Sequence, residues 1–262
     1  MKKLFIGLAI AVGVFTGTSA FSQAQKPSIV LVHGAFADAS SWTGVIKILR
    51  KDGYVVIAPA NPLRGVKSDG QYIGSLLGSL KQSVVLVGHS YGGSVITEAA
   101  NDHPNVKALV YVAAFTPATG ESAADLANKF PGSTLGPTLA PPVPLSGGSK
   151  DLYILPDKFP AQFAADVPAA QAALMAATQR PITDAALNEK SGKAAWQTLP
   201  SWHIYGSADK NIPPEAMAFM SKRANAKEVK VVKGASHVVM VSHPEEVARM
   251  IEAAAAAAAA AK

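Results

Sequence analysis

Hydrophobic residues along the chain gather in short continuous runs rather than in strict alternation with polar residues. Six such runs span residues 28–32, 54–58, 83–87, 106–113, 202–205 and 228–232. Continuous apolar runs of this length predict strands that are buried on both faces, as in a parallel sheet.

Helical periodicity occupies the stretches between these runs. Apolar residues recur three or four positions apart in residues 39–51, 68–80, 91–101, 214–224 and 244–261. Because strands and helices alternate, the pattern predicts an α/β fold: a doubly wound, mostly parallel sheet of about six strands. The alanine tract at 253–261 is expected to extend the last helix.

Residues 117–193 interrupt the alternation. A stretch rich in Pro, Gly, Ser, Thr and Leu covers 131–149, and alanine-rich helical patterns follow at 159–179 and 183–192. Long insertions in compact domains are usually functional, often as lids, so we expect a helical cap at about 117–193. The alternative is a surface excursion that only covers the core.

The first 24 residues resemble an export signal. Lys2 and Lys3 precede an apolar run, Leu4–Val14, and small residues follow at 18–20, 22 and 24. We therefore expect cleavage of a signal peptide, residues 1–24, and export to the periplasm or the medium. An uncleaved membrane anchor is the alternative, although the run is short for a bilayer span. Residues 25–262 would then form one domain.

The amino-acid composition excludes several classes of site and partner. The chain has 262 residues, 49% hydrophobic and 16% charged, which suits one sizeable core. It has no cysteine, so disulfides, thiolate metal sites and a cysteine nucleophile are excluded. The net charge of +6, or +4 without the two leading lysines, is scattered, so no nucleic acid partner is expected. No later run is long enough to cross a bilayer, so no membrane association is expected after cleavage.

Gly88-His89-Ser90-Tyr91-Gly92 fits the pattern Gly-x-Ser-x-Gly between a predicted strand and a predicted helix. In that context the serine lies on a sharp, strained turn, and the flanking glycines let neighbouring backbone approach closely. Ser90 is therefore the candidate nucleophile. The alternative is a glycine-rich turn with a buried capping serine.

A serine hydroxyl needs an adjacent base to act as a nucleophile. Among six histidines, His237 follows the last predicted strand and would lie at the same sheet edge as Ser90. His243, which precedes Pro244 at a helix start, is the second candidate. His33 and His89 lie in turn motifs, where we expect local hydrogen bonds, and His203 lies inside a strand.

The base in turn needs a carboxylate to set its tautomer. Asp209 follows the fifth predicted strand, and the order Ser90, Asp209, His237 is the one expected for a strand-turn-helix nucleophile. Asp209 could instead cap the helix near Pro214. Asp125 and Asp184 belong to the insertion and are weaker candidates.

An oxyanion hole requires two backbone N–H donors. We expect one from Tyr91, the residue after the nucleophile, and one from Ala35, in the loop after the first strand. Phe36 and Trp42 are candidate substrate contacts, and Tyr91 could also shape an apolar pocket. Core packing is the common alternative for such side chains.

Taken together, these motifs resemble the α/β-hydrolase superfamily over nearly the whole mature chain. The matching segments are V-L-V-H-G-A, V-G-H-S-Y-G-G, Y-G-S-A-D-K-N-I-P and G-A-S-H. The subgroup of small plant esterases and hydroxynitrile lyases, with bacterial relatives, is the most similar. In that resemblance the lyases carry threonine after the first histidine and lysine after the late one, where this chain has Gly34 and Val238.

The resemblance implies ester hydrolysis rather than cyanohydrin cleavage, on a minimal six-stranded sheet. We expect a serine carboxylester hydrolase that acts through an acyl-enzyme on a small ester, with no metal or organic cofactor, because no ligand cluster or phosphate-binding loop is present. Two alternatives stay open: a lyase or cofactor-free haloperoxidase, and a ligand-binding protein with a slow triad. The oligomeric state does not follow from the sequence.

Overall fold

The computed structural model describes Met1 and residues 26–260. The predicted signal peptide therefore lies almost wholly outside the described residues. Within this part of the chain, no helix is both long and apolar enough to cross a membrane.

Six parallel strands form the central sheet, as the apolar runs predict. In spatial order they are β2 (Val56–Ile57), β1 (Ser28–Val32), β3 (Val84–His89), β4 (Val106–Val112), β8 (Ser201–Gly206) and β9 (Glu228–Val232). Every neighbouring pair is parallel, so all carboxyl ends meet at one edge. The predicted doubly wound α/β fold is confirmed.

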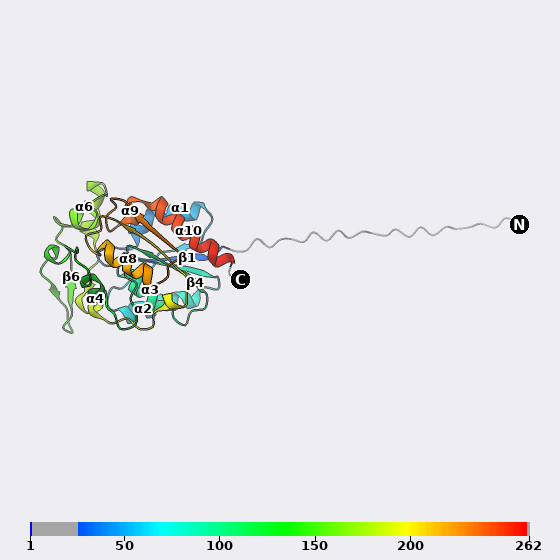
Figure 1. The fold of residues 1–262 in the computed structure, drawn as a ribbon, viewed down its shortest axis with the longest axis horizontal. Helices are drawn as coiled ribbons and strands as arrows, with labels where there is room; N and C mark the ends of the chain where they lie inside the picture. Colours follow the sequence, from blue (N-terminus) through cyan, green and yellow to red (C-terminus); the bar gives the residue numbers. More distant parts are fainter. Residues whose placement is uncertain (2–25, 261–262) are drawn as a thin grey trace.

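Helices cover both faces of the central strands, which explains why these strands are apolar without alternation. The prediction of burial on both faces is wrong for the edge strand β9, where only Val232 is buried. On one face α1 (Thr43–Lys51) packs against α10 (Pro244–Ala260), and on the other α2 (Val66–Ser79) packs against α3 (Gly92–Ala99) (Figure 1). The helix α8 (Pro214–Arg223) contacts β8. Every residue of β1 and of β3 is buried between these layers.

Two predicted elements differ in extent. The strand expected over 54–58 is reduced to β2, because it lies at the edge of the sheet and pairs with β1 alone. The helix expected over 39–51 begins with a 3-10 turn, η1 (Ala39–Trp42), in which the Asp38 side chain accepts a hydrogen bond from the Ser40 N–H.

The cap segment, residues 117–193, lies at one end of the sheet (Figure 1) and contains more than the two predicted helical stretches. The pattern at 159–179 is split around Pro168 into two helices, and a small antiparallel sheet, β5-β6-β7, was not predicted. In chain order, the elements of the cap segment are α4 (Ala123–Asn128), η2 (Gly136–Thr138), β5 (Val143–Pro144), β6 (Lys150–Leu152), α5 (Phe159–Phe163), α6 (Ala169–Thr178), β7 (Ile182–Thr183) and α7 (Asp184–Asn188). After the cap segment, η3 (Ala195–Gln197) leads to β8.

Candidate active site

Ser90 lies on a strained turn between β3 and α3. Its φ of 54° is in the left-handed region, which costs a non-glycine residue on the order of 1–3 kcal/mol. Four backbone contacts hold it there: its N–H points to the carbonyls of Val112 and Ala113, at 3.3 and 3.2 Å, and its carbonyl accepts from Gly93 and Phe115, at 2.9 and 3.1 Å. The turn therefore presents the hydroxyl at the carboxyl edge of the sheet.

The glycines of this turn are needed for close backbone approach. A Cβ atom at Gly88 would lie 2.5 Å from the carbonyl oxygen of Gly92, and one at Gly92 would lie 2.5 Å from that of Val32. Both distances are shorter than van der Waals contact, so a side chain at either position would push α3 away from the sheet. The steric reason predicted for the motif is present in the fold.

Asp209 and His237 form a buried pair on neighbouring loops. The acid loop, residues 207–213, follows β8, and the base loop, residues 233–238, follows β9. His237 Nδ1 lies 2.6 Å from Asp209 Oδ2, and the two side chains are 1% and 0% exposed. Because a carboxylate only accepts hydrogen bonds, Nδ1 carries the proton and Nε2 keeps its lone pair in the neutral ring.

Asp209 does not cap α8, which has no side-chain cap, but it does shape the turn before that helix. Its Oδ1 accepts hydrogen bonds from the N–H groups of Asn211 and Ile212, at 2.8 and 3.0 Å. One carboxylate oxygen thus shapes the acid loop while the other meets His237. The second base candidate, His243, contacts Ser242 Oγ and lies 3.6 Å from Asp166 Oδ2 instead.

His89 and His33 hold the backbone on either side of the site. His89 Nε2 lies 3.1 Å from the His237 carbonyl oxygen, so the local hydrogen bond expected for His89 is instead a contact across 148 positions. Burial, and then the nearby His237, lower the pKa of His89 well below its ordinary value. His33 makes the expected local hydrogen bond, from Nδ1 to the Gly34 carbonyl, and also a contact across 28 positions, in which Nε2 accepts from the Asn61 N–H, both at 2.9 Å.

The two predicted oxyanion donors lie on touching turns. A Cβ atom at Gly34 would be 2.7 Å from Ser90 Cβ and 3.1 Å from the Tyr91 nitrogen, so the Ala35 loop packs directly against the Ser90 turn. Within the described residues, neither the Ala35 nor the Tyr91 N–H donates to another protein group. Both are free to bind a negatively charged oxygen.

A small cavity brings most of the predicted site residues together. It has a volume of about 90 Å³, and Ser90, Tyr91, His237, Ala35 and Phe36 all line it. Ser90 and His237 both line its wall, and no direct hydrogen bond joins their side chains. The other walls are Phe115, Ala123, Ala124, Ala127, Ser133, Leu135, Phe163, Leu187, Asn211 and Ile212, mostly from the cap segment.

One of the three aromatic residues considered as pocket residues, Trp42, does not line the cavity. Trp42 is fully buried and does not line the cavity; its ring packs edge-on against His89, with centroids 6.4 Å apart. The Tyr91 ring does face the cavity region, and its hydroxyl donates to Asp69 Oδ2 at 2.9 Å. Trp42 therefore supports the site from behind rather than contacting substrate.

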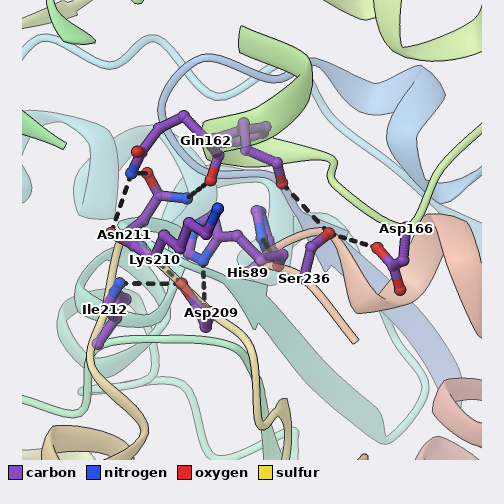
Figure 2. A network of polar contacts seen from close by, with 10 residues as sticks. His89, Gln162, Asp166, Asp209, Lys210, Asn211, Ile212 and Ser236 are labelled. Atoms are coloured by element: carbon purple, nitrogen blue, oxygen red, sulfur yellow. Dashed lines mark hydrogen bonds and ion pairs between the residues drawn. The ribbon is translucent and has the colours of Figure 1, made fainter. Parts of the chain in front are cut away.

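Gln162 of the cap segment fastens α5 to the acid loop. Its Nε2 donates to the Lys210 carbonyl at 2.9 Å and to Asn211 Oδ1 at 3.1 Å (Figure 2). Its Oε1 accepts from Thr134 Oγ1 at 2.8 Å. Asn211 Nδ2 in turn donates to the Gln162 carbonyl at 3.3 Å. Gln162 and Asn211 are buried, so the polar atoms of these two side chains depend on one another.

Asp166 fastens the same end of the cap segment to the base loop. The Ser236 hydroxyl donates to Asp166 Oδ1 at 2.5 Å, one residue before His237 (Figure 2). Sequence reasoning missed Gln162, Asp166 and Asn211. Only Asn211 carried a signal, since an Asp-x-Asn segment is typical of a turn in which the aspartate accepts backbone hydrogen bonds.

No group of three or more His, Asp or Glu side chains in the described part of the chain is arranged to hold a metal ion. The groups that converge at Ser90 are its hydroxyl, an imidazole paired with a carboxylate, and two backbone amide donors. This set can carry out acyl transfer with protein groups alone.

Comparison with known proteins agrees with this geometry. The model of the "Alpha/beta hydrolase family" matches residues 29–250. An alpha-hydroxynitrile lyase of Arabidopsis thaliana is 27% identical over 244 residues, covering 85% of this chain and 94% of the lyase. The esterase PIR7B of Oryza sativa subsp. japonica is 27% identical over 252 residues, covering 86% and 94%.

The fold has solved counterparts as well. The crystal structure of polyneuridine aldehyde esterase superposes with a TM-score of 0.75 at 21% identity, covering 87% of this chain and 99% of that one. Since the family model spans most of the chain and the strand order, turn and loops agree with it, the chain belongs to the alpha/beta hydrolase family.

Proposed function

We propose that the protein is a carboxylester hydrolase that forms an acyl-enzyme at Ser90. One observation carries the proposal: the buried Asp209–His237 pair shares an apolar cavity with a serine held on a strained turn. Strain at a single nucleophilic residue persists when the surrounding fold holds it, as four backbone contacts do here.

The reaction follows from the positions of these groups. Ser90 Oγ attacks the ester carbonyl carbon while His237 Nε2 takes the hydroxyl proton, and the N–H groups of Ala35 and Tyr91 bind the resulting oxyanion. The C–O bond to the alcohol then breaks, and His237 returns the proton to the departing oxygen. Water, deprotonated by His237, attacks the acyl-enzyme and releases the acid and Ser90.

Two features favour hydrolysis over cyanohydrin cleavage. The lyases that the sequence resembles carry threonine at the position of Gly34, yet a Cβ atom here would lie 2.6 Å from the His89 carbonyl oxygen. Val238, which stands where they carry lysine, is fully buried. Because one relative is a hydroxynitrile lyase, cyanohydrin cleavage stays the second candidate reaction. The esterase among the relatives supports ester hydrolysis as the first.

A fluorophosphonate probe and p-nitrophenyl esters of graded chain length test the proposal. We expect covalent labelling at Ser90, loss of labelling in Ser90→Ala, slow labelling in His237→Ala, and turnover of short-chain esters. A lyase would cleave aromatic cyanohydrins and leave esters nearly untouched. A binding protein with a slow triad would be labelled sluggishly and hydrolyse esters no faster than buffer does. Folded protein with neither labelling nor ester turnover would overturn the proposal.

A further inference from the structure

A second and larger hollow, here called the outer groove, lies beside the Ser90 cavity. Its volume is about 580 Å³, and it runs between α6 of the cap segment and the start of α1. Apolar walls come from Phe36, Leu174, Met175 and Val241, and polar side chains such as Lys47 and Gln171 lie at its border. Pockets that hold small organic ligands usually measure about 300–1,000 Å³, so the outer groove is in that range and the 90 Å³ cavity is well below it.

Phe36 separates the two spaces, because its side chain lines both. Its φ of 58° is again in the left-handed region, which is strained for a residue with a side chain. The backbone is held there by a hydrogen bond from the Phe36 N–H to the Arg180 carbonyl, at 3.0 Å. The ring meets Phe163 edge-on, with centroids 6.1 Å apart. The cap and the core thus cooperate in placing one aromatic ring between the cavity and the groove.

Polar contacts hold the cap segment to the core at α5. There α5 is fastened to the acid loop through Gln162, and Asp166, shortly after α5, is fastened to the base loop. Moving α5 away would break the buried hydrogen bond between Gln162 and Asn211 and leave polar groups unpaired. Phe36 meets the cap segment through the Phe163 ring and the Arg180 carbonyl. Because displacing the Phe36 ring breaks no side-chain hydrogen bond, its position is the easier route for a substrate.

Resting on the proposed esterase function, we propose that the outer groove binds the alcohol half of the ester, while a short acyl group occupies the Ser90 cavity. The acyl carbon becomes bonded to Ser90, so the acyl chain must fit where Ser90 lies. The departing oxygen of the alcohol must reach His237. Val241, four residues further along the chain, lines the outer groove, so we place the alcohol on the groove side. The ester bond then passes Phe36, and an alcohol with an apolar body matches the groove walls.

Two ester series separate the halves of the substrate. The first pairs acetate with alcohols that grow from methyl to benzyl and naphthylmethyl, and the second pairs methanol with acids of the same sizes. We expect kcat/KM to rise along the alcohol series and to fall along the acid series. The reverse order, or equal tolerance in both series, would overturn the assignment of the groove.

Two substitutions on the surface give a matched comparison. Thr178→Trp fills the outer groove from the exposed face of α6, whereas Ser75→Trp places the same side chain in an unrelated hollow between α2 and α3. Thr178→Trp should lower kcat/KM for naphthylmethyl acetate relative to ethyl acetate by about tenfold, the scale on which a pocket discriminates size. Ser75→Trp should leave the ratio unchanged. An unchanged ratio in Thr178→Trp would contradict the proposal.

Failure of this inference can be told from failure of the proposed function. If the chain hydrolyses no ester and Ser90 is not labelled by a fluorophosphonate, the esterase proposal fails. If esters are hydrolysed and Ser90 is labelled but the two series show no preference for a bulky alcohol, only the groove assignment fails.

Discussion

His89 Nε2 donates a hydrogen bond to the main-chain carbonyl of His237, at 3.1 Å, although the two residues lie 148 positions apart. Their rings are 4.8 Å apart, and both are buried. His89 immediately precedes Ser90, so the strand that delivers the proposed nucleophile also holds the loop that delivers the proposed base. A neutral imidazole is enough to donate this hydrogen bond. Because the pKa of His89 is lowered, its ring stays neutral and places no positive charge beside His237.

Removing this contact should slow chemistry without abolishing it. We expect His89→Phe, which keeps an aromatic ring between Trp42 and Phe163, to lower kcat by roughly 10- to 100-fold, the range that a displacement of about 1 Å produces. KM should change little. Steady-state kinetics on a short-chain ester measures both. His203→Phe is the matched control, because His203 is equally buried but stacks on Tyr111, away from the site; equal losses in both variants would refute the positioning role.

The proposed triad should behave as one unit. Ser90→Ala and His237→Ala are expected to lower turnover by similar large factors, since neither group can act without the other. Asp209→Asn should cost on the order of a thousandfold or more, because an amide can donate to His237 Nδ1 and so select the wrong tautomer. His243→Ala should be mild. Ester hydrolysis rates decide the assignment, and a severe His243→Ala with a mild His237→Ala would move the base to His243.

Gln162 should matter for stability as well as for activity. Gln162→Leu leaves the buried Asn211 Oδ1 without its donor, at about 1–3 kcal/mol, and also removes the hydrogen bonds to the Lys210 carbonyl and the Thr134 hydroxyl. We therefore expect a lower midpoint in thermal unfolding and a lower kcat. Gln71→Leu, at an exposed glutamine on α2, serves as the control. If the two variants unfold at the same temperature, the cluster around Gln162 contributes nothing to stability.

Stability should fall in acid because buried histidines must gain protons on unfolding. Burial lowers the pKa of His203 to about 3, against 6.5 in an exposed chain. Between these values the unfolded chain binds a proton at this site that the folded protein does not, so the free energy of unfolding decreases as pH falls, by about 1.4 kcal/mol per pH unit. His89 acts in the same direction.

Urea unfolding at pH 7 and pH 5 measures this dependence. His203→Phe should lose less stability than the parent chain between the two pH values. Ile204→Val, its neighbour in β8, should be destabilised equally at both. A parent chain and a His203→Phe variant with identical pH dependence would contradict the linkage.

We further propose that the chain is exported and cleaved near Ala20 or Ala24. Intact-mass analysis of periplasmic or secreted protein should show a start shortly after one of these residues. Replacing Val12 with Arg interrupts the apolar run and should leave the full-length chain in the cytoplasm. Uncleaved parent protein in the membrane fraction would instead support an anchor.

The sheet was predictable because its physics is local to each strand. A strand between two helical layers must be apolar throughout, and the runs ending at Val32 and His89 show this directly. The loops after β3, β8 and β9 then meet at one edge, so Ser90, Asp209 and His237 could be placed from strand order alone. Lengths at the sheet edge were less predictable, since β2 pairs on one side only.

The cap segment and the contacts of single side chains were not predictable in this way. Strands of two or three residues, such as β5 and β7, are too short to show a period, and alanine-rich sequence suits a helix whether or not Pro168 interrupts it. Whether Trp42 faces a pocket or His89 depends on residues that fold around it from elsewhere. The partner of Gln162 lies 49 positions away, in a loop whose path the sequence does not specify.

The cluster around Gln162 also limits how this chain can be recombined. Insertions such as residues 117–193 are natural units to exchange between relatives when a new substrate range is wanted, but here part of the scaffold for Asp209 lies within the exchanged piece. A chimera that takes a foreign insertion alone would present Lys210 and Asn211 with unmatched partners. Exchanging the insertion together with residues 207–213 keeps each hydrogen-bond donor with the acceptor from the same parent, so the two segments should be exchanged together.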